Sequence, residues 1–544
     1  MAVWNYADIW ESVAAAVPER PAQIRGERVI SWADFDRRAN GLAQALLDAG
    51  LTRQSKVAAY LYNAPEYLET YFAAFKAGLA PVNTNYRYVA DELIYLFDNA
   101  DAEAVVFDAQ FGPRVAAIRD KLPMLKTLIE IDDGSGLHLD GAARFEALIA
   151  AHDPYPRQDY AEDDLFMIYT GGTTGMPKGV MSRQGDRAHS GVMAAFTPLG
   201  LPRPATREDF QASIRQIHAM GQAKVSLIAC PLMHGTGLTG GAHHPQLAGG
   251  CAVTVRNERF DPEALWRVVE RQRVTQIAIV GDTFGKPMLA ALEAAAAAGR
   301  PFDLSSLKWM FSAGVMFSAE TKQGLLKFAD MTINDAMAAT EGAMGVSLVS
   351  RSTPPGETAK FTRHPTTKVF DEHDREVLPG SDTIGMIANG GAAPVGYYKD
   401  PEKSARTFRT IDGHRYSFPG DYAKVAADGS LILLGRGSNC INTGGEKVFP
   451  EEVEEALKAH PDVADCLVVG VPDERFGQRI TAVVSLASGH RLDEDALLAF
   501  VRTRIAGYKL PRRLIVVDEV RRGANGKADY PWANKVASEA AVEG

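Results

Sequence analysis

Stretches with helical periodicity alternate with short β-branched runs along most of the chain, and this alternation limits the fold more than any other feature. The first cycle runs from the amphipathic residues 34–49 through the strand-like residues 56–61 to the helical residues 65–77. Helices in such a series cross over a sheet between neighbouring parallel strands. We therefore predict an α/β fold built on parallel strands.

The pattern changes toward the C-terminus, and this change sets the predicted domains. Residues 368–377, 415–425 and 429–434 resemble strands of an antiparallel β subdomain, separated by turns. After residues 435–439 a compact α+β unit begins. We predict a large N-terminal domain at 1–434, made of α/β subdomains and a β subdomain, a hinge at 435–439 and a small mobile C-terminal domain at 440–544. By contrast, the polar residues 199–223 lack periodicity, so we expect a surface excursion there.

Composition excludes several classes of protein. Lys and Arg number 58 against 68 Asp and Glu, and the formal charge of -10 argues against a generally basic nucleic-acid-binding surface. The four cysteines form no CxxC pair, as expected in a reducing compartment. Asp8 and Glu11 interrupt the stretch that a signal peptide would need, so we expect a cytoplasmic protein. Because no apolar run is long enough to span a bilayer, any membrane contact should be peripheral.

Residues 169–179, with the sequence YTGGTTGMPKG, carry the strongest chemical signal. The glycines allow backbone N–H groups to turn toward an anion, the threonine hydroxyls add donors, and Lys178 adds a positive charge. It is not a Walker A loop, because Gly179 follows Lys178 and no helix begins directly afterwards. We interpret the segment as a phosphate-binding loop; a flexible hairpin loop without a ligand is the alternative.

The segment resembles the phosphate loop of the adenylate-forming superfamily, which includes acyl-CoA synthetases, peptide-synthetase adenylation domains and beetle luciferases. Other segments of that family follow in its order over nearly the whole chain. They are the histidine segment 231–237, the adenine strand 312–315, the magnesium-carboxylate segment 339–341, the ribose-aspartate segment 419–421, the hinge and following loop within 435–448, and the catalytic-lysine loop 523–527.

The resemblance implies ATP, Mg²⁺ and CoA as cofactor and cosubstrates. It implies catalytic roles for Lys527, Glu341, Thr170 and His234, and it makes Glu341 the Mg²⁺ ligand. It implies that nucleotide and CoA are bound by Thr170, Gly171, Gly172, Thr173, Thr174, Gly175, Lys178, Ala313, Gly314, Asp335, Met337, Thr340, Asp421, Arg436, Gly444, Gly445 and Lys509.

The chemistry of carboxylate activation requires these residue types independently of the resemblance. Attack of a carboxylate on the α-phosphate of ATP brings two anions together, so the site needs cations and a divalent metal. Lys178, Lys527 and a metal held by Glu341 meet that need. Asp421, which follows a Pro-Gly turn, can accept hydrogen bonds from both ribose hydroxyls.

Each of these residues also has a plain structural alternative. The alternative for Glu341 is an ion-paired or solvated carboxylate, and the alternative for Asp421 is a turn cap. Arg436 is a candidate for a salt bridge, His234 for a packed histidine rather than a gate between the acyl pocket and CoA, and Lys509 for a solvated lysine.

Two positions depart from the family pattern. Many members carry an aromatic residue where this chain has Met337, so a thioether replaces an aromatic stack against adenine. The hinge residue, usually Asp or Lys, is Asn439 here; asparagine tolerates unusual backbone angles, so we expect hinging to be retained.

The acyl pocket is expected to be roomy and apolar. Five flexible or aromatic side chains lie in stretches that should approach the acyl group: Met233, Met316, Phe317, Met337 and Met344. Asp282 is unusual near such a pocket. We predict that it caps a helix beginning near Thr283; a contact with a polar group of the substrate is the alternative.

The prediction is an AMP-forming acyl-CoA synthetase that resembles bacterial enzymes acting on fatty or steroid-side-chain carboxylates. Two alternatives stay open. One is an adenylating enzyme that passes its acyl group to a carrier protein or oxidises the adenylate; the other is a non-catalytic nucleotide-binding protein on the same scaffold. Small-molecule partners are therefore a carboxylic acid, ATP and CoA, with no nucleic acid, and a homodimer is left open.

Overall fold

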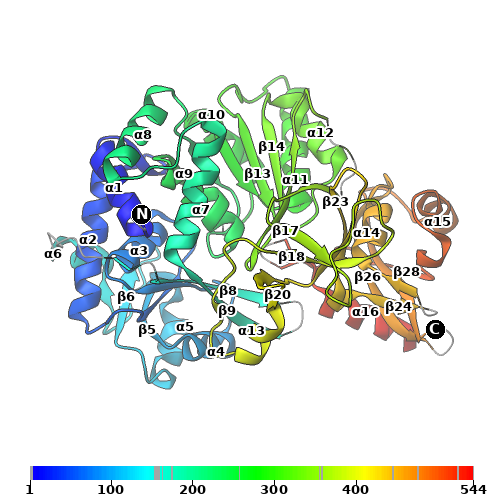
Figure 1. Ribbon diagram of the computed structural model, residues 1–544, viewed down its shortest axis with the longest axis horizontal. Coiled ribbons are helices and arrows are strands. Elements are labelled where there is room, and N and C mark those ends of the chain that lie inside the picture. Colours follow the sequence, from blue (N-terminus) through cyan, green and yellow to red (C-terminus); the bar gives the residue numbers. More distant parts are fainter. Residues whose placement is uncertain are drawn as a thin grey trace.

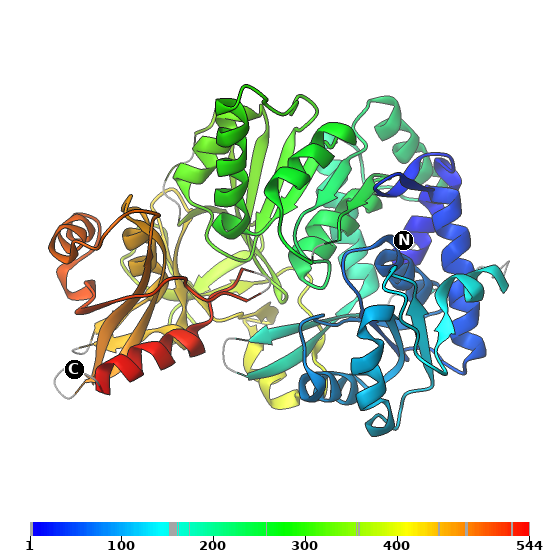
Figure 2. The same cartoon turned by 180° about the vertical axis from the view of Figure 1, so that it is seen from behind.

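The computed structural model describes residues 4–151, 160–161, 163–172, 175–256, 258–354, 356, 359–443, 446–473, 477–523 and 526–542. A large N-terminal domain and a small C-terminal domain are both mixed α/β. Figures 1 and 2 show the C-terminal domain at one end of the long axis and the N-terminal helices toward the other end. The predicted fold class is confirmed.

The first sheet is parallel throughout. Its order is β4 (Ala80–Asn83), β3 (Lys56–Tyr60), β5 (Ala102–Asp108), β6 (Thr127–Ile131) and β7 (Ala143–Arg144). The connecting helices are α3 (Pro65–Lys76), α4 (Ala90–Ala100) and α5 (Gly112–Ile118), and α6 (Phe145–Ala151) follows β7. This is the predicted strand–helix rhythm, and short apolar strands buried on both faces are typical of it.

A 15-stranded sheet passes from a parallel half to an antiparallel half. The parallel half contains β1 (Pro21–Arg25), β11 (Cys251–Thr254), β10 (Val225–Ile228), β12 (Gln276–Ile279), β13 (Trp309–Ala313) and β14 (Thr332–Ala339), with β2 (Arg28–Ser31) antiparallel at its edge. The antiparallel half contains β15 (Gly342–Val349), β16 (Lys360–Arg363), β23 (Leu431–Arg436), β22 (Asp421–Val425), β18 (Gly385–Asn389), β17 (Thr367–Phe370), β21 (His414–Ser417) and β20 (Phe408–Ile411).

A third sheet has three strands. It pairs β8 (Leu165–Gly172) with β9 (Gly175–Arg183) in an antiparallel hairpin, and β9 with β19 (Gly396–Tyr397). Helix α13 (Pro401–Thr407) follows β19. The predicted phosphate loop is therefore the tip of a hairpin.

The C-terminal domain has its own sheet, ordered β25 (Glu446–Val448), β24 (Ile441–Thr443), β27 (Gly477–Leu486) and β26 (Val463–Asp473), with β28 (Arg513–Val516) beside β27. Its helices are α14 (Pro450–Lys458), α15 (Glu494–Arg502) and α16 (Tyr530–Val542). Helix α14 begins at the predicted proline, with acidic residues in its first turn and Lys458 in its last. A short 3₁₀ turn, Gly437–Asn439, joins this domain to β23.

The remaining helices pack around the parallel half of the large sheet. They are α1 (Tyr6–Ala16), α2 (Trp32–Asp48), α7 (Gln184–Phe196), α8 (Arg207–Ala219), α9 (His244–Leu247), α10 (Pro262–Arg271), α11 (Gly281–Ala297) and α12 (Ala319–Phe328), with a π-helix at Thr236–His243. The four cysteines are free thiols, as expected. Within the described residues, none of the helices has the length and apolarity that crossing a bilayer requires.

The expectation for residues 199–223 is wrong, because that segment contains helix α8. Thr206 caps it by accepting a hydrogen bond from the Asp209 backbone N–H, and the Asp209 side chain accepts one in return. Phe210 is buried and stacks on Phe196, with 5.8 Å between ring centroids. A capping box closed by Asp rather than Glu or Gln is the local signal that the sequence reading missed.

Candidate active site

One cavity of about 1040 Å³ lies between the two domains and is lined by residues of both. Its wall includes twelve of the predicted site residues: Thr170, Lys178, His234, Ala313, Gly314, Asp335, Met337, Thr340, Glu341, Asp421, Arg436 and Lys527. These positions are scattered over more than three hundred residues of sequence. The fold therefore brings these twelve residues together in one place.

The β8–β9 hairpin presents Thr170 and Lys178 as direct partners in its ladder. Gly172 pairs with Gly175 at the tip, whereas Thr173 and Thr174 lie outside the described residues. Burial, and after it the neighbouring Lys403, lowers the pKa of Lys178 to about 8. An anion bound here would restore the charge on Lys178, so the electrostatics favour a phosphate ligand.

Asn83, at the end of β4, fastens the base of this hairpin. Its side-chain oxygen accepts a hydrogen bond from the Tyr169 N–H at 2.7 Å, and its amide nitrogen donates to the carbonyls of Tyr169 at 2.8 Å and Met233 at 2.6 Å. One buried amide thus ties the phosphate-loop strand to the histidine segment. Sequence reasoning missed Asn83, because its partners belong to two other elements distant in the chain.

Glu341 sits in the turn between β14 and β15 and is only 9% exposed. Its Oε1 accepts a hydrogen bond from the Tyr397 hydroxyl at 2.6 Å. Lys178 Nζ lies 4.8 Å from the centroid of the same Tyr397 ring, a cation–π distance. Tyr397 therefore links the hairpin cation to the predicted metal ligand, and no local sequence signal points to it, because the contact depends on β19 pairing with β9.

Asp421 and Arg436 face each other across the β22–β23 ladder, where Arg436 Nε donates to Asp421 Oδ1 at 3.2 Å. The other carboxylate oxygen, Asp421 Oδ2, is buried and has no hydrogen-bond partner among the described residues. The salt bridge named as the alternative for Arg436 is therefore present, yet it leaves an acceptor oxygen available on the cavity wall. A buried acceptor without a donor is costly unless a ligand supplies one.

Lys527 reaches the cavity from the C-terminal domain. Burial, followed by the positive charge of Arg436, lowers the pKa of Lys527, while Glu341 and Asp421 oppose that effect. The cavity thus holds Lys178 from one domain and Lys527 from the other. These two lysines share the cavity wall with Glu341 and Asp421, and cations beside a carboxylate that can hold a metal are what a polyphosphate needs.

His234 lines the cavity with a buried Nε2 that, in the part of the chain that the structure describes, has no hydrogen-bond partner. Burial, with Lys527 as a smaller cause, lowers the pKa of His234 to about 3. The imidazole is therefore neutral at physiological pH. The packed-histidine alternative would have predicted satisfied ring nitrogens.

Asp335 is held by an ion pair instead of being free in the cavity. Lys322 Nζ lies 2.6 Å from Asp335 Oδ2, and both side chains are buried. Burial raises the pKa of Asp335 to about 6 even though Lys322 opposes the shift. Asp335 sits on β14 beside Met337, so the pair also anchors the strand that lines this wall.

Three predicted CoA-binding positions differ from the rest. Gly444 and Gly445 lie outside the described residues. Lys509 is not among the residues of the cavity wall; its Nζ lies 2.5 Å from Glu452 Oε1.

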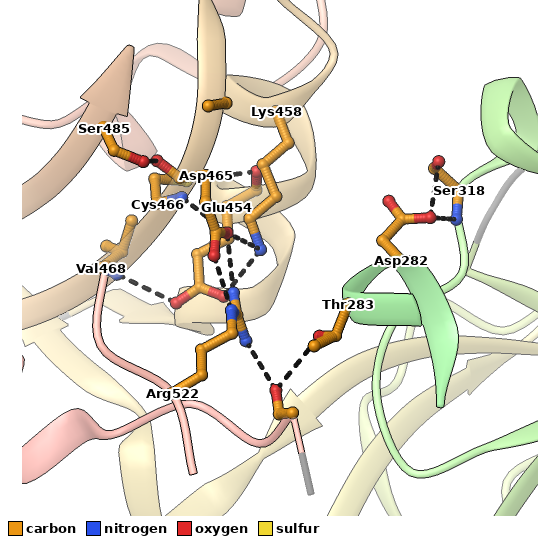
Figure 3. A network of polar contacts seen from close by, with 12 residues as sticks. Asp282, Thr283, Ser318, Glu454, Lys458, Asp465, Cys466, Val468, Ser485 and Arg522 are labelled. Atoms are coloured by element: carbon orange, nitrogen blue, oxygen red, sulfur yellow. Dashed lines mark hydrogen bonds and ion pairs between the residues drawn. The ribbon is translucent and has the colours of Figure 1, made fainter. Parts of the chain in front are cut away.

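The prediction for Asp282 is wrong. Helix α11 begins at Gly281 with no side-chain cap, and Asp282 Oδ1 instead accepts hydrogen bonds from the backbone N–H and hydroxyl of Ser318, both at 3.0 Å (Figure 3). Asp282 is also absent from the cavity wall. It braces the residue that caps α12, so neither helix capping of α11 nor a substrate contact describes it.

Comparison with known proteins agrees with this geometry. The chain matches the AMP-binding enzyme family over residues 10–398 and the AMP-binding enzyme C-terminal domain over residues 452–527. The anthranilate CoA ligase AuaEII, solved with anthranoyl-AMP, shares the fold with a TM-score of 0.85 at 22% identity, covering 100% of this chain and 99% of that one.

Two curated relatives are much closer in sequence. A medium/long-chain-fatty-acid–CoA/3-oxocholest-4-en-26-oate–CoA ligase of Mycolicibacterium smegmatis is 41% identical, covering 98% of this chain and 97% of the relative. A 3-oxocholest-4-en-26-oate–CoA ligase of Rhodococcus rhodochrous is 39% identical, covering 97% and 95%. The chain therefore belongs to the AMP-binding enzyme family, and within it is an AMP-forming acyl-CoA ligase.

Proposed function

We propose that this enzyme forms the CoA thioester of a medium- or long-chain fatty acid or of a steroid side-chain carboxylate. In the first step a carboxylate oxygen bonds to the α-phosphorus of ATP and pyrophosphate leaves. In the second step the CoA sulfur bonds to the acyl carbon and AMP leaves. The observation that carries the proposal is that Lys178, Glu341, Asp421 and Lys527 line one cavity that also has a large apolar wall.

Different polar residues of the cavity are assigned to different parts of the nucleotide. We assign Thr170 and Lys178, partners in the hairpin ladder, to the phosphates that leave. We assign a ribose hydroxyl to Asp421 Oδ2, because this buried oxygen has no hydrogen-bond partner among the described residues. Lys527 then faces the charge that develops at the α-phosphate. Such preorganised cations stabilise the transition state more than the ground state, because negative charge concentrates there during attack.

Glu341 fits a magnesium site that the nucleotide completes. Mg²⁺ in nucleotide enzymes commonly uses one or two carboxylates, with phosphate oxygens and waters as the other ligands. Among the described residues, no cluster of three or more His, Cys, Asp or Glu side chains could hold a metal alone. Glu341, oriented by Tyr397, is the carboxylate this chain offers. When bound there, Mg²⁺ would neutralise part of the phosphate charge.

The apolar wall supports the acyl part of the proposal. All five side chains expected to approach the acyl group line the cavity: Met233, Met316, Phe317, Met337 and Met344. Methionine adapts to ligands of different shape, and the volume lies at the upper end of the range for small-molecule sites. Because the relatives from Mycolicibacterium and Rhodococcus are named for fatty acids and for a steroid acid, we assign the same substrates to this cavity.

A panel of carboxylic acids tests the proposal. Wild-type enzyme with ATP, Mg²⁺ and CoA should release pyrophosphate and form thioester with a long-chain fatty acid or a steroid side-chain acid. It should form much less thioester with benzoate, because benzoate is too small to contact the whole apolar wall. Reactions without CoA should stop at the adenylate. Thioester formation with benzoate alone would contradict the substrate assignment, and pyrophosphate release without thioester would favour a carrier-protein acceptor.

A further inference from the structure

The backbone carbonyl of Gly526, the residue before Lys527, is held from both domains at once. Thr283 Oγ1, in the first turn of α11, donates a hydrogen bond to it at 3.4 Å. Arg522 Nη1, from the C-terminal domain, donates to the same carbonyl at 3.2 Å. Figure 3 shows Thr283 and Arg522 converging from opposite sides. The Gly526 carbonyl and the Lys527 backbone nitrogen belong to the same planar peptide unit. Hydrogen bonds that hold this carbonyl therefore also fix the orientation of the Lys527 backbone nitrogen.

Arg522 is itself rigidly anchored. Its Nε lies 2.6 Å from Asp465 Oδ2 and its Nη2 lies 2.8 Å from Asp465 Oδ1, a two-pronged pairing. Lys458 Nζ lies 3.4 Å from Asp465 and 3.8 Å from Glu454. Glu454 in turn accepts from the Val468 N–H at 2.9 Å, as Figure 3 shows. A network of this kind holds the guanidinium in one place on the sheet of the C-terminal domain.

The lysine loop is also closed on itself. The Gly523 N–H donates to the Lys527 carbonyl and the Gly526 N–H donates to the Gly523 carbonyl, each at 2.9 Å. Arg522 and Ala528 pair at the base of the turn. A movement of Gly526 therefore carries Lys527 with it.

The contact with Thr283 is close as well as polar. Gly526 has a φ of +72°, and a Cβ added there would lie 2.8 Å from Thr283 Oγ1 and 2.9 Å from Thr283 Cβ. One turn along α11, Lys286 Nζ donates to the Ala464 carbonyl at 3.4 Å. Residues three apart share a helix face, so this face of α11 is a surface on which the C-terminal domain rests.

We infer that Thr283 is a positioning residue that, together with Arg522, holds Lys527 at the cavity for adenylate formation and loses this contact when the C-terminal domain moves for thioester formation. The inference rests on the proposed two-step function. Thr283 does not line the cavity, so its effect must pass through Gly526. Loss of its hydroxyl should therefore lower one half-reaction and spare the other.

Thr283→Val removes the hydroxyl with little change of shape, and Thr283→Ser keeps the hydroxyl. Acyl-adenylate formation is measured by ATP–pyrophosphate exchange, and thioester formation is measured from supplied acyl-adenylate and CoA. We expect Thr283→Val to lower kcat for adenylation by about fivefold, the worth of one hydrogen bond, with an unchanged rate from supplied adenylate. Thr283→Ser should recover most of the exchange rate.

Equal loss of both half-reactions in Thr283→Val, an unchanged exchange rate, or failure of Thr283→Ser to recover it would each overturn the inference. These outcomes are read against a wild-type enzyme that adenylates an acid. If the wild type adenylates no acid in the panel, the proposed function itself fails, which is a separate result.

Discussion

Lys527 is the residue whose charge we expect adenylate formation to depend on most. It is one of the cations that the C-terminal domain contributes to the cavity wall, where Glu341 and Asp421 also lie. Lys527→Ala should lower acyl-adenylate formation by about 3 kcal/mol or more in transition-state stabilisation, because a cation aimed at developing charge is typically worth that much. Thioester formation from supplied adenylate should suffer less.

The matched control is Lys535→Ala, which removes an exposed lysine on α16, with a side chain 73% exposed, that pairs only loosely with Glu539 at 3.9 Å. Pyrophosphate exchange should be normal in this control. Wild-type exchange in Lys527→Ala would show that the lysine loop has another task.

Lys178 should give nucleotide binding a pH dependence. Its pKa is about 8 because burial and the nearby Lys403 disfavour the charged form. As pH rises through about 8, the unliganded protein loses this charge, so ATP affinity should fall; below that pH the charge is present and affinity should level off. Calorimetric titration with ATP and Mg²⁺ across this range measures the effect.

Two variants check the assignment to Lys178. Lys178→Arg should flatten the decline, because arginine stays protonated throughout. Lys403→Ala should move the decline to higher pH, since it removes a neighbouring positive charge. A decline that persists unchanged in Lys178→Arg would assign the titration to another group.

At the scale of single elements, the cap of α8 offers a direct test of the helix that periodicity did not reveal. Thr206→Ala removes the acceptor for the Asp209 N–H and should destabilise this helix by about 1 kcal/mol. Amide exchange should quicken within residues 207–219, while exchange in the C-terminal domain stays the same. Arg215→Ala, an exposed position on the same helix, should leave both unchanged. Equal protection of α8 in wild type and Thr206→Ala would show that packing of its buried face, and not the cap, holds it.

Helices and strands were predictable where their signals lie within their own residues. Side-chain contacts between elements distant in the sequence were not predictable. The strand at Lys56–Tyr60 was predictable from its apolar run. The helix at Pro450–Lys458 was predictable from the proline and acidic residues at its start and the lysine at its end. Asp282 shows the limit: a helix beginning near it was predictable, but its role as a cap was wrong and its partner is Ser318, thirty-six positions away. Asn83 and Tyr397 escaped notice for the same reason, because strand pairing across the molecule decides what they touch.

At the scale of the whole molecule, the complete site needs residues of both domains, because both line the cavity. The segments that carry Lys178, Glu341 and Asp421 were predictable by resemblance, and the fold brings them into one cavity with Lys527. The orientation of the C-terminal domain was not readable from sequence, since it depends on contacts such as Thr283 with Gly526 and the Arg436 N–H with Glu451 at 3.3 Å. Each such contact is weak alone, as befits a domain that must move.

The 3₁₀ turn Gly437–Asn439 is where we place the rotation between the two half-reactions. It lies between β23, which carries Arg436, and β24, the first strand of the C-terminal sheet. Asn439→Pro should uncouple the half-reactions, because proline fixes φ near −65° and also restricts Ser438 before it. We expect one half-reaction to fall by about a hundredfold, the cost of a misplaced catalytic group, while the other continues.

The comparison that isolates rotation is Asn439→Ala, which shortens the side chain but leaves both backbone angles free. It should support both half-reactions at rates near wild type, measured by pyrophosphate exchange and by thioester formation from supplied adenylate. A proline variant that loses both rates together would indicate damage to the junction of β23 and β24 instead of a locked hinge. Retention of both rates would place the rotation at another residue, because a fixed φ at 439 would then be compatible with both arrangements of the C-terminal domain.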